Sequence, residues 1–164
     1  VAPAAHSTKR RRGSTIMAFW QTPQSKGLIT PPRPIYAGVV NYEVAEFTVS
    51  ADFTAASDVL ELTMLPAGAV PVRATLIGEG LGAINADIGF MSGTFGDVDD
   101  TRTVGDELFN GTSVNDNEAD ATALTLRAIS SDRTKHRPIG ATLSGDVAAG
   151  AAKKLTFIME YVAA

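Results

Sequence analysis

From residue 43 onward, apolar side chains recur at every second position of the chain instead of every third or fourth. A period of two is typical of β-strands with one buried face, and the Gly, Pro, Asp and Ser residues between the apolar runs mark turns. The pattern predicts seven or eight short strands and no helix of three turns. Seven of these strands should lie at residues 43–50, 58–65, 70–77, 84–91, 121–129, 137–144 and 154–162.

Many short strands separated by turns favour an all-β fold, an antiparallel β-sandwich, and we expect its strands to follow a jelly-roll connectivity. One turn is predicted at Pro66 and Gly68, and another at residues 145–154. Two packed sheets need a shared apolar interior. We expect this interior to contain Phe47, Val49, Leu60, Leu62, Leu65, Val72, Leu76, Ile88, Phe90, Leu124, Leu126, Ile139, Leu143, Leu155, Phe157 and Met159.

The last predicted strand, residues 154–162, has apolar side chains on both of its faces. Alternate residues of a strand share a face. Ile158 and Val162 lie on one face, which predicts that this face is buried in the fold or contacts another subunit. The opposite face should point into the interior and carries Leu155, Phe157, Met159 and Tyr161.

Residues 17–42 form a different kind of segment, which contains four of the chain's eight prolines. Proline fixes φ and lacks a backbone N–H, so this segment should be an extended N-terminal arm. At ~3.3 Å per residue it could reach up to ~85 Å, and its apolar side chains need a surface to lie on. The arm either wraps its own domain or crosses to a neighbouring subunit. The interaction residues expected on it are Phe19, Trp20, Leu28, Ile29, Arg33, Ile35 and Tyr36.

Charge divides the chain into a basic start and an acidic body. Residues 1–42 carry six basic side chains and no acid, whereas residues 43–164 carry eight bases and eighteen acids. Residues 1–16, with the run KRRR, read as a basic flexible extension before a natural start at Met17. The run could neutralise phosphates, but we favour a solvated end. The predicted organisation is therefore an extension (1–16), an arm (17–42) and a β-sandwich domain (43–164).

An acidic loop, residues 92–112, is the most conspicuous candidate site. A calcium loop of the EF-hand type needs Gly at position 6 and Glu at position 12, and counting from Asp97 these positions hold Arg102 and Leu108. An irregular calcium site built from Asp97, Asp99 and Asp100 is a remaining alternative. We expect instead that the three aspartates lie at a solvated tip or against a basic neighbour, and that Arg102 balances part of their charge in an exposed ion pair.

We also expect the same loop to be anchored by its apolar residues and to contain one short helical turn. Phe95, Leu108 and Phe109 should pack against the body. Thr103 could cap a single turn in which Asp106 and Glu107 occupy the favourable N-terminal end.

Other chemistry finds little support in the sequence. The chain has no cysteine, and His6 and His136 are too far apart in the sequence to form a metal-ligand pair. The chain contains no GxSxG motif. The nearest approach to a phosphate-binding glycine motif, residues 78–83, is not followed by the helix that such a motif needs. The sequence indicates neither a membrane span nor a secretory signal. We therefore expect no catalytic residue, no metal, no cofactor and a role in assembly.

Three motifs in the middle of the chain resemble a group of phage proteins. They are LPAG (residues 65–68) followed by Val70, the alternating DIGFMSG (87–93) and, after the acidic loop, GDELFNG (105–111); LTFIMEYVA (155–163) resembles the closing strand. The pattern covers roughly residues 35–163. It resembles the head decoration, or cement, proteins of tailed bacteriophages, small structural proteins encoded near the major capsid protein.

The resemblance implies a virion protein on the outer surface of the icosahedral capsid, assembled in the host cytoplasm. Its implied partners are the major capsid protein and sister copies in a homotrimer, with no membrane and no direct nucleic-acid contact. Multivalent binding would strengthen the shell. Two alternatives stay open: a receptor- or glycan-binding β module, and another head or tail component of the virion.

Overall fold

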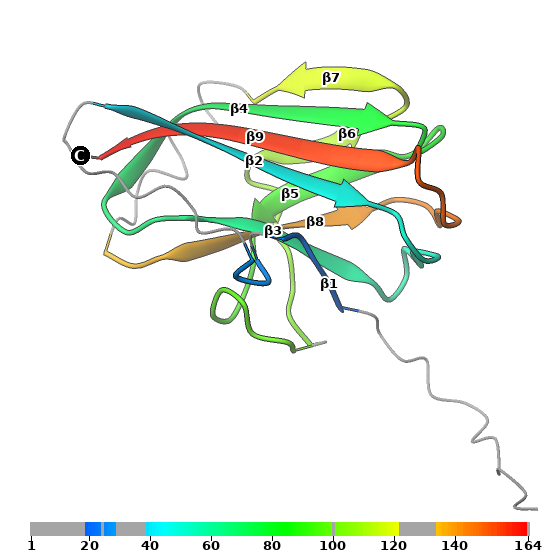
Figure 1. The fold of residues 1–164 in the computed structure, drawn as a ribbon, viewed down its shortest axis with the longest axis horizontal. Helices are drawn as coiled ribbons and strands as arrows, with labels where there is room; N and C mark the ends of the chain where they lie inside the picture. The colour runs from blue at the N-terminus through cyan, green and yellow to red at the C-terminus, as the bar shows by residue number, and fades with distance from the viewer. Residues whose placement is uncertain (1–18, 24, 29–38, 100, 122–133, 164) are drawn as a thin grey trace, which may run out of the picture.

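The alternating pattern is realised as strands in the computed structural model, which describes residues 19–23, 25–28, 39–99, 101–121 and 134–163. Within these residues nine strands form two sheets that lie face to face, so the predicted all-β sandwich is confirmed (Figure 1). The strands are β1 (Phe19–Gln21), β2 (Val40–Thr48), β3 (Val59–Leu65), β4 (Ala69–Glu79), β5 (Asn85–Phe90), β6 (Phe109–Ser113), β7 (Asn117–Asp120), β8 (Arg137–Leu143) and β9 (Lys154–Ala163).

One sheet has five strands in the order β1-β3-β8-β5-β6, and the other has four in the order β2-β9-β4-β7. Every pairing in the two sheets is antiparallel except that of β1, which runs parallel to β3. The antiparallel pairing predicted for the body is confirmed among the described strands, and a piece of the predicted arm adds β1 as a parallel edge strand. A parallel pair needs a long connection between its strands, and here the rest of the arm and β2 lie between β1 and β3 in the chain.

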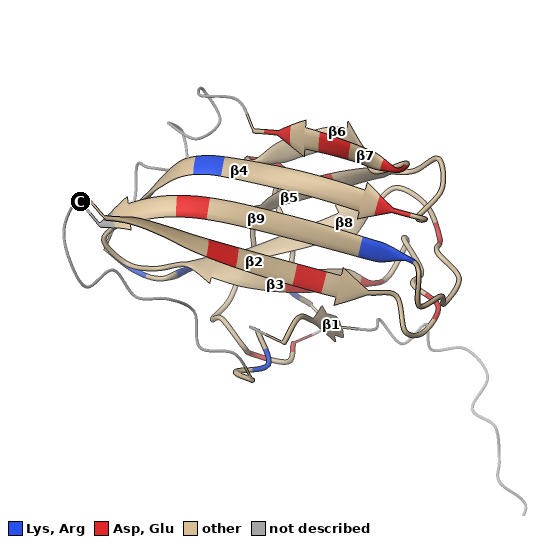
Figure 2. Cartoon of the chain, turned by 45° about the horizontal axis from the view of Figure 1, so that its top comes forward, with Lys and Arg blue, Asp and Glu red and all other residues tan. Residues whose placement is uncertain are grey.

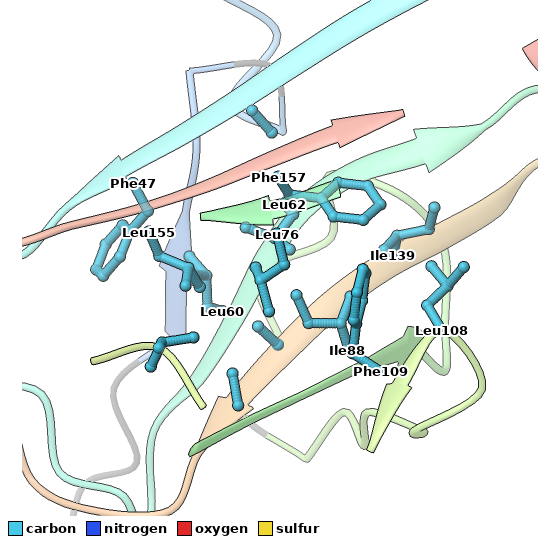
Figure 3. Close-up of a cluster of buried hydrophobic side chains, with 14 of the residues drawn as sticks. Phe47, Leu60, Leu62, Leu76, Ile88, Leu108, Phe109, Ile139, Leu155 and Phe157 are labelled. Atoms are coloured by element: carbon cyan, nitrogen blue, oxygen red, sulfur yellow. The ribbon is translucent and has the colours of Figure 1, made fainter. Parts of the chain in front are cut away.

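Apolar side chains from both sheets meet in one interior cluster (Figure 3). The inward face of β9 is fully buried, as predicted: Leu155, Phe157, Met159 and Tyr161 are each 0% exposed. Its outward face is only half-buried at Ile158 and Val162, so the described residues do not close it. The other expected core residues that the structure confirms are Phe47, Val49, Leu60, Leu62, Leu65, Leu76, Ile88, Ile139 and Leu143.

Val72 was expected in the core and is 48% exposed. The register between β4 and β9 shifts between Pro71 and Arg73, which leaves Val72 as the extra residue of a bulge. The bulge reverses the alternation, so Ala74 and Leu76 point inward after it. Phe90 packs against the core but is only partly buried. Leu124, Leu126 and the predicted strand 121–129 fall outside the described residues, apart from Ala121.

The acidic segment after residue 92 contains more strand than predicted. β6 and β7 occupy positions expected to be loop. The predicted helical turn at residues 103–110 is wrong: Val104 forms a β-bridge with Met91, and the amides of Gly105 and Leu108 donate to the carbonyls of Phe90 and Ile88. The carbonyls of Ile88 and Phe90 near the end of β5 therefore accept hydrogen bonds from this backbone in place of a helix.

Two glycines explain why the chain turns or packs where it does. Gly68 has a φ of 78°, and the amide of Ala69 donates to Pro66 to close the predicted turn between β3 and β4. Gly89 on β5 faces Glu107, and a Cβ placed there would lie 2.1 Å from Glu107 Oε2. None of the described segments is a helix long and apolar enough to cross a membrane.

Candidate functional site

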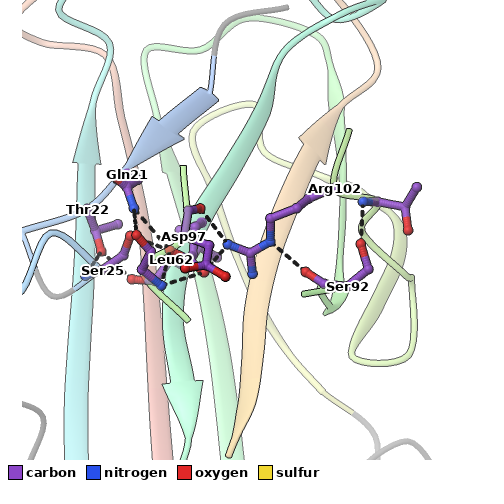
Figure 4. Close-up of polar contacts among 10 residues, drawn as sticks. Gln21, Thr22, Ser25, Leu62, Ser92, Asp97 and Arg102 are labelled. Atoms are coloured by element: carbon purple, nitrogen blue, oxygen red, sulfur yellow. Dashed lines mark hydrogen bonds and ion pairs between the residues drawn. The ribbon is translucent and has the colours of Figure 1, made fainter. Parts of the chain in front are cut away.

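One buried carboxylate attaches two peripheral segments to the sandwich (Figure 4). Glu61 on β3 is fully buried. Its Oε2 accepts hydrogen bonds from Ser25 Oγ at 2.7 Å and Gln21 Nε2 at 3.2 Å, both on the arm side, and from the amide of Gly96 at 3.0 Å in the acidic loop. Its Oε1 pairs with Arg102 Nη1 at 2.7 Å. Glu61 therefore joins the arm and the acidic loop to the same strand.

Arg102 is the main correction to the predicted site. It was expected at the surface beside the aspartates, but it is 3% exposed and pairs with Glu61. Its guanidinium donates to the carbonyls of Ser92 and Asp97, at 2.5 and 3.1 Å, and lies 5.5 Å from the ring centre of Phe19. The loop thus wraps around a buried cation, which fixes its backbone.

The tip of the acidic loop is solvated, as predicted, at Asp97 and Asp99. The carboxylate of Asp99 accepts hydrogen bonds from the hydroxyl and amide of Thr101, at 2.7 and 2.8 Å. These bonds, the hydroxyl first, lower the pKa of Asp99 below its ordinary value. Asp100 lies outside the described residues.

Packing anchors the loop, also as predicted, because Leu108 and Phe109 are buried and Phe95 is half-buried. The alternative calcium site at the tip is not tested, because Asp100, one of its three aspartates, lies outside the described residues. Among the residues that the structure describes, no group of three or more His, Asp or Glu side chains could hold a metal ion.

Three of the arm residues predicted to make interactions lie in the described part of the chain. Phe19 and Trp20 are half-buried against their own body. The indole of Trp20 donates to Asp58 Oδ2 at 3.1 Å and packs edge-on against Phe47, with ring centres 5.9 Å apart. Leu28, in contrast, is 76% exposed. Ile29, Arg33, Ile35 and Tyr36 lie outside the described residues.

The outer face of the four-stranded sheet carries exposed apolar side chains near the start of β2. Val40, Tyr42 and Val72 are 53%, 56% and 48% exposed. The register places Val40 beside Val162, which is paired on its other side with Val70. We call these five residues the sheet patch. Acidic residues dominate elsewhere on this sheet, with basic side chains on β4 and β9 (Figure 2).

A second buried acid lies between the sheets. Glu43 on β2 is 4% exposed and accepts a hydrogen bond from the hydroxyl of Thr63 on β3. Burial raises the pKa of Glu43, and the hydrogen bond from Thr63 offsets part of that rise. Burial, and then the nearby charge of Glu43, raise the pKa of Tyr161 to about 12. This cluster is an interior polar group that links β2, β3 and β9.

The sequence reasoning missed Glu61 and Glu43 as structural centres. A single charged residue inside the apolar run VLELTML was the available signal for Glu61, since burying a carboxylate requires partners. His136 is exposed, and its Nδ1 accepts a hydrogen bond from the amide of Ala67 at 3.1 Å.

Comparisons with known proteins give one strong relationship. No model of a protein family matches the chain, and no curated protein matches it. Among solved structures, a chain in "Capsid of Ralstonia phage GP4" is 34% identical, with a TM-score of 0.78, over 90% of this chain and 99% of that one. A chain in "Cyanophage Pam1 capsid asymmetric unit" shares the fold at 15% identity, with a TM-score of 0.52 over 83% of this chain and 93% of that one.

Identity of this degree along nearly the whole of both chains shows common descent and a common fold. The fold of this chain is therefore shared with that capsid chain. This chain belongs to the family of phage capsid proteins that is represented in the Ralstonia phage GP4 capsid.

Proposed function

We propose that this protein is a decoration protein, which binds the outer surface of an icosahedral phage capsid and stabilises it. Its partners are the major capsid protein and sister copies, arranged as homotrimers, and it performs no catalysis and contacts no nucleic acid directly. The observation that carries the proposal is the 34% identity, over nearly the full length, to a chain of the Ralstonia phage GP4 capsid. The motifs LPAG, DIGFMSG and GDELFNG, which resemble decoration proteins, add to it.

The strand order supports a jelly roll as the finer description of the sandwich. With β1 set aside, the outermost strands in the chain, β2 and β9, pair with each other. Moving inward along the chain, β3 pairs with β8, β4 with β7 and β5 with β6. Nested pairing of eight strands across two sheets is what rolling one long hairpin produces, and jelly rolls are common in capsid domains.

Three surfaces could share the binding to the shell. The sheet patch offers apolar area, Leu28 is an exposed apolar anchor, and the acidic loop offers charge. Each contact alone is small, but linked contacts raise the effective concentration of the later ones to about millimolar. Shell binding can therefore be strong without any enclosed site.

The test is to add purified full-length protein to capsid shells that lack it and to count the copies bound per particle. A decoration protein should bind in a number comparable to that of the major capsid protein, and bound shells should resist heat better. A few copies at one location would instead favour another head or tail component. Binding to a glycan array without binding to shells would favour the receptor module.

Point variants separate the surfaces better than removal of the arm would, because β1 and Ser25 belong to the packing of the body. Val40→Glu in the sheet patch and Leu28→Asp in the arm should each reduce occupancy on shells. Ala148→Glu, at an exposed position in the turn before β9, is the matched control and should bind normally. Equal occupancy of all three variants would reject these surfaces as contacts.

A further inference from the structure

A pocket of about 390 Å³ lies at one end of the sandwich, where β5 ends and β8 begins. Phe90, Met91 and Pro138 give it apolar walls, and Lys135, His136 and Arg137 give it polar ones. Residues 43–164 carry eight bases against eighteen acids, so two basic side chains and a histidine in succession stand out from their surroundings. The combination suits an apolar side chain flanked by negative charge.

The polar wall of the pocket is held in a defined arrangement. Arg137 is 6% exposed, lies 5.1 Å from the ring centre of Phe90 and donates from Nη2 to the carbonyl of Ala69. His136 accepts the amide hydrogen of Ala67 at Nδ1. A neutral imidazole that accepts at one nitrogen carries its proton on the other. Nε2 of His136 can therefore donate to a carboxylate.

The tip of the acidic loop has the complementary character. Val98 is 79% exposed, the highest value among the large apolar side chains described, and Asp97 and Asp99 flank it. Hydrogen bonds fix the backbone of the tip: the amide of Gly96 donates to Glu61, and Arg102 donates to the carbonyl of Asp97. An apolar side chain between two acids is thus presented on a fixed loop.

We propose that Asp97, Val98 and Asp99 of one copy dock into this pocket of a second copy. Val98 packs against the wall formed by Phe90, and the two carboxylates face Lys135 and His136. The partner is a sister copy because the two surfaces of this chain match in charge and polarity, and such complementarity selects partners.

The tip and the pocket of one chain do not meet each other. The described lining of the pocket takes Ser92 and Gly93 from the base of the loop and nothing from its tip. The tip is instead tied to Glu61 on β3. The contact is therefore heterologous, and when repeated about a rotation axis it closes a ring.

This contact rests on the proposed function, because the shell is what holds sister copies side by side. A stable interface buries about 800 Å² per partner, which one loop tip does not supply. We therefore expect weak association in free solution and a firm contact when copies are neighbours on a particle, where the effective concentration is about millimolar.

The chain has no cysteine, so disulfide trapping is specific. Full-length Val98→Cys and Lys135→Cys variants are mixed and oxidised, both in concentrated solution and on capsid shells. Heterodimers are expected in the mixture, at least tenfold more than the dimers in either variant alone. A mixture of Val98→Cys with Ala151→Cys, which is exposed in the turn before β9, is the control. No excess over this control in either setting overturns the proposal.

Charge exchange gives a second test that does not depend on cysteine. Asp97→Lys with Asp99→Lys should lower association of the free protein at least tenfold, and Lys135→Glu with His136→Glu should do the same. A mixture of the two charge variants should associate again, and failure to do so counts against the contact. If the protein binds shells but no disulfide-trapped dimers form, only this contact is rejected. Trapped dimers of a protein that does not bind shells would reject only the decoration role.

Discussion

Glu61 on β3 and Arg102 in the acidic loop form an ion pair 2.7 Å long, in which the two side chains are 0% and 2% exposed. The pair crosses from the sandwich to a loop that has no strand of its own at that point. Removing two charges from water costs several kcal/mol for each ion, so such a pair adds little net stability. The pair serves to position the arm and the loop, because both bind the same carboxylate of Glu61.

Replacing only one partner of this pair should be costly. Glu61→Gln leaves the charge of Arg102 buried, and we expect the free energy of unfolding to fall by about 3–5 kcal/mol. Urea denaturation of the full-length variant measures it. Glu46→Gln is the control, because Glu46 pairs with Lys154 at 3.0 Å on the surface, and it should cost less than about 1 kcal/mol. Equal losses in the two variants would contradict the role given to Glu61.

Glu43 should make stability depend on pH in the direction opposite to most carboxylates. Burial raises its pKa above the ordinary 4.5, so the folded state holds the proton more tightly than the unfolded state does. The ionised form costs stability above the folded-state pKa, and this cost disappears as the pH falls to the ordinary value. Glu43→Gln should therefore be more stable than the unmodified protein at neutral pH.

The gain from Glu43→Gln should be about 1.4 kcal/mol for each pH unit by which the folded-state pKa is raised. Unfolding free energies of both proteins, measured from pH 7 down to pH 4, should converge at the acid end. A constant difference across this range would show that Glu43 does not titrate differently in the two states.

Two positions on β4, one at the bulge and one after it, test which side chains of this strand point inward. Leu76 is 1% exposed, and Leu76→Ala should cost about 2–5 kcal/mol through lost burial and a cavity. Val72→Ala, at the exposed bulge position, should stay within about 0.5 kcal/mol. Thermal or urea unfolding measures both. A large loss at Val72 would mean that the strand has the register expected from simple alternation.

Gly89 should not tolerate a side chain. A Cβ at this position would meet Glu107 Oε2 at 2.1 Å and the carbonyl carbon of Gly105 at 2.5 Å. Glu107 can move away but the backbone of Gly105 cannot, so Gly89→Ala should cost about 1–3 kcal/mol or more. Adding Glu107→Ala should recover only part of the loss. Full recovery in the double variant would show that the backbone contact is unimportant.

The strands with strong alternation could be predicted from the sequence because each has one clearly buried face. β9 is the best case, since all four predicted inward residues are fully buried. β6 and β7 were missed because edge strands have one neighbour, and their Asn, Gly, Ser and Asp residues read as loop. The exposure of Val72 depends on a bulge, which no period of two can anticipate.

The sequence correctly predicts that the tip of the acidic loop is solvated, but it wrongly predicts the structure of the base of the loop. Solvation of Asp97 and Asp99 follows from composition, and burial of Leu108 and Phe109 follows from their apolar side chains. The burial of Arg102 does not follow from either, because its partner Glu61 lies in a distant strand. Such a pair depends on how the strands are connected in space, and the sequence predicts only the fold class, an all-β sandwich.

The placement of Trp20 gives the molecule a built-in optical reporter. It is the only tryptophan in the chain, and its indole sits where the arm meets the sandwich, against Phe47 and Asp58. Detachment of the arm would transfer this indole from a half-apolar contact into water, while the interior of the sandwich contains no second indole to obscure the change. Tryptophan emission therefore reports the attachment of the arm, whereas backbone signals report the sheets. Measured on one sample, the two signals distinguish detachment of the arm from unfolding of the body.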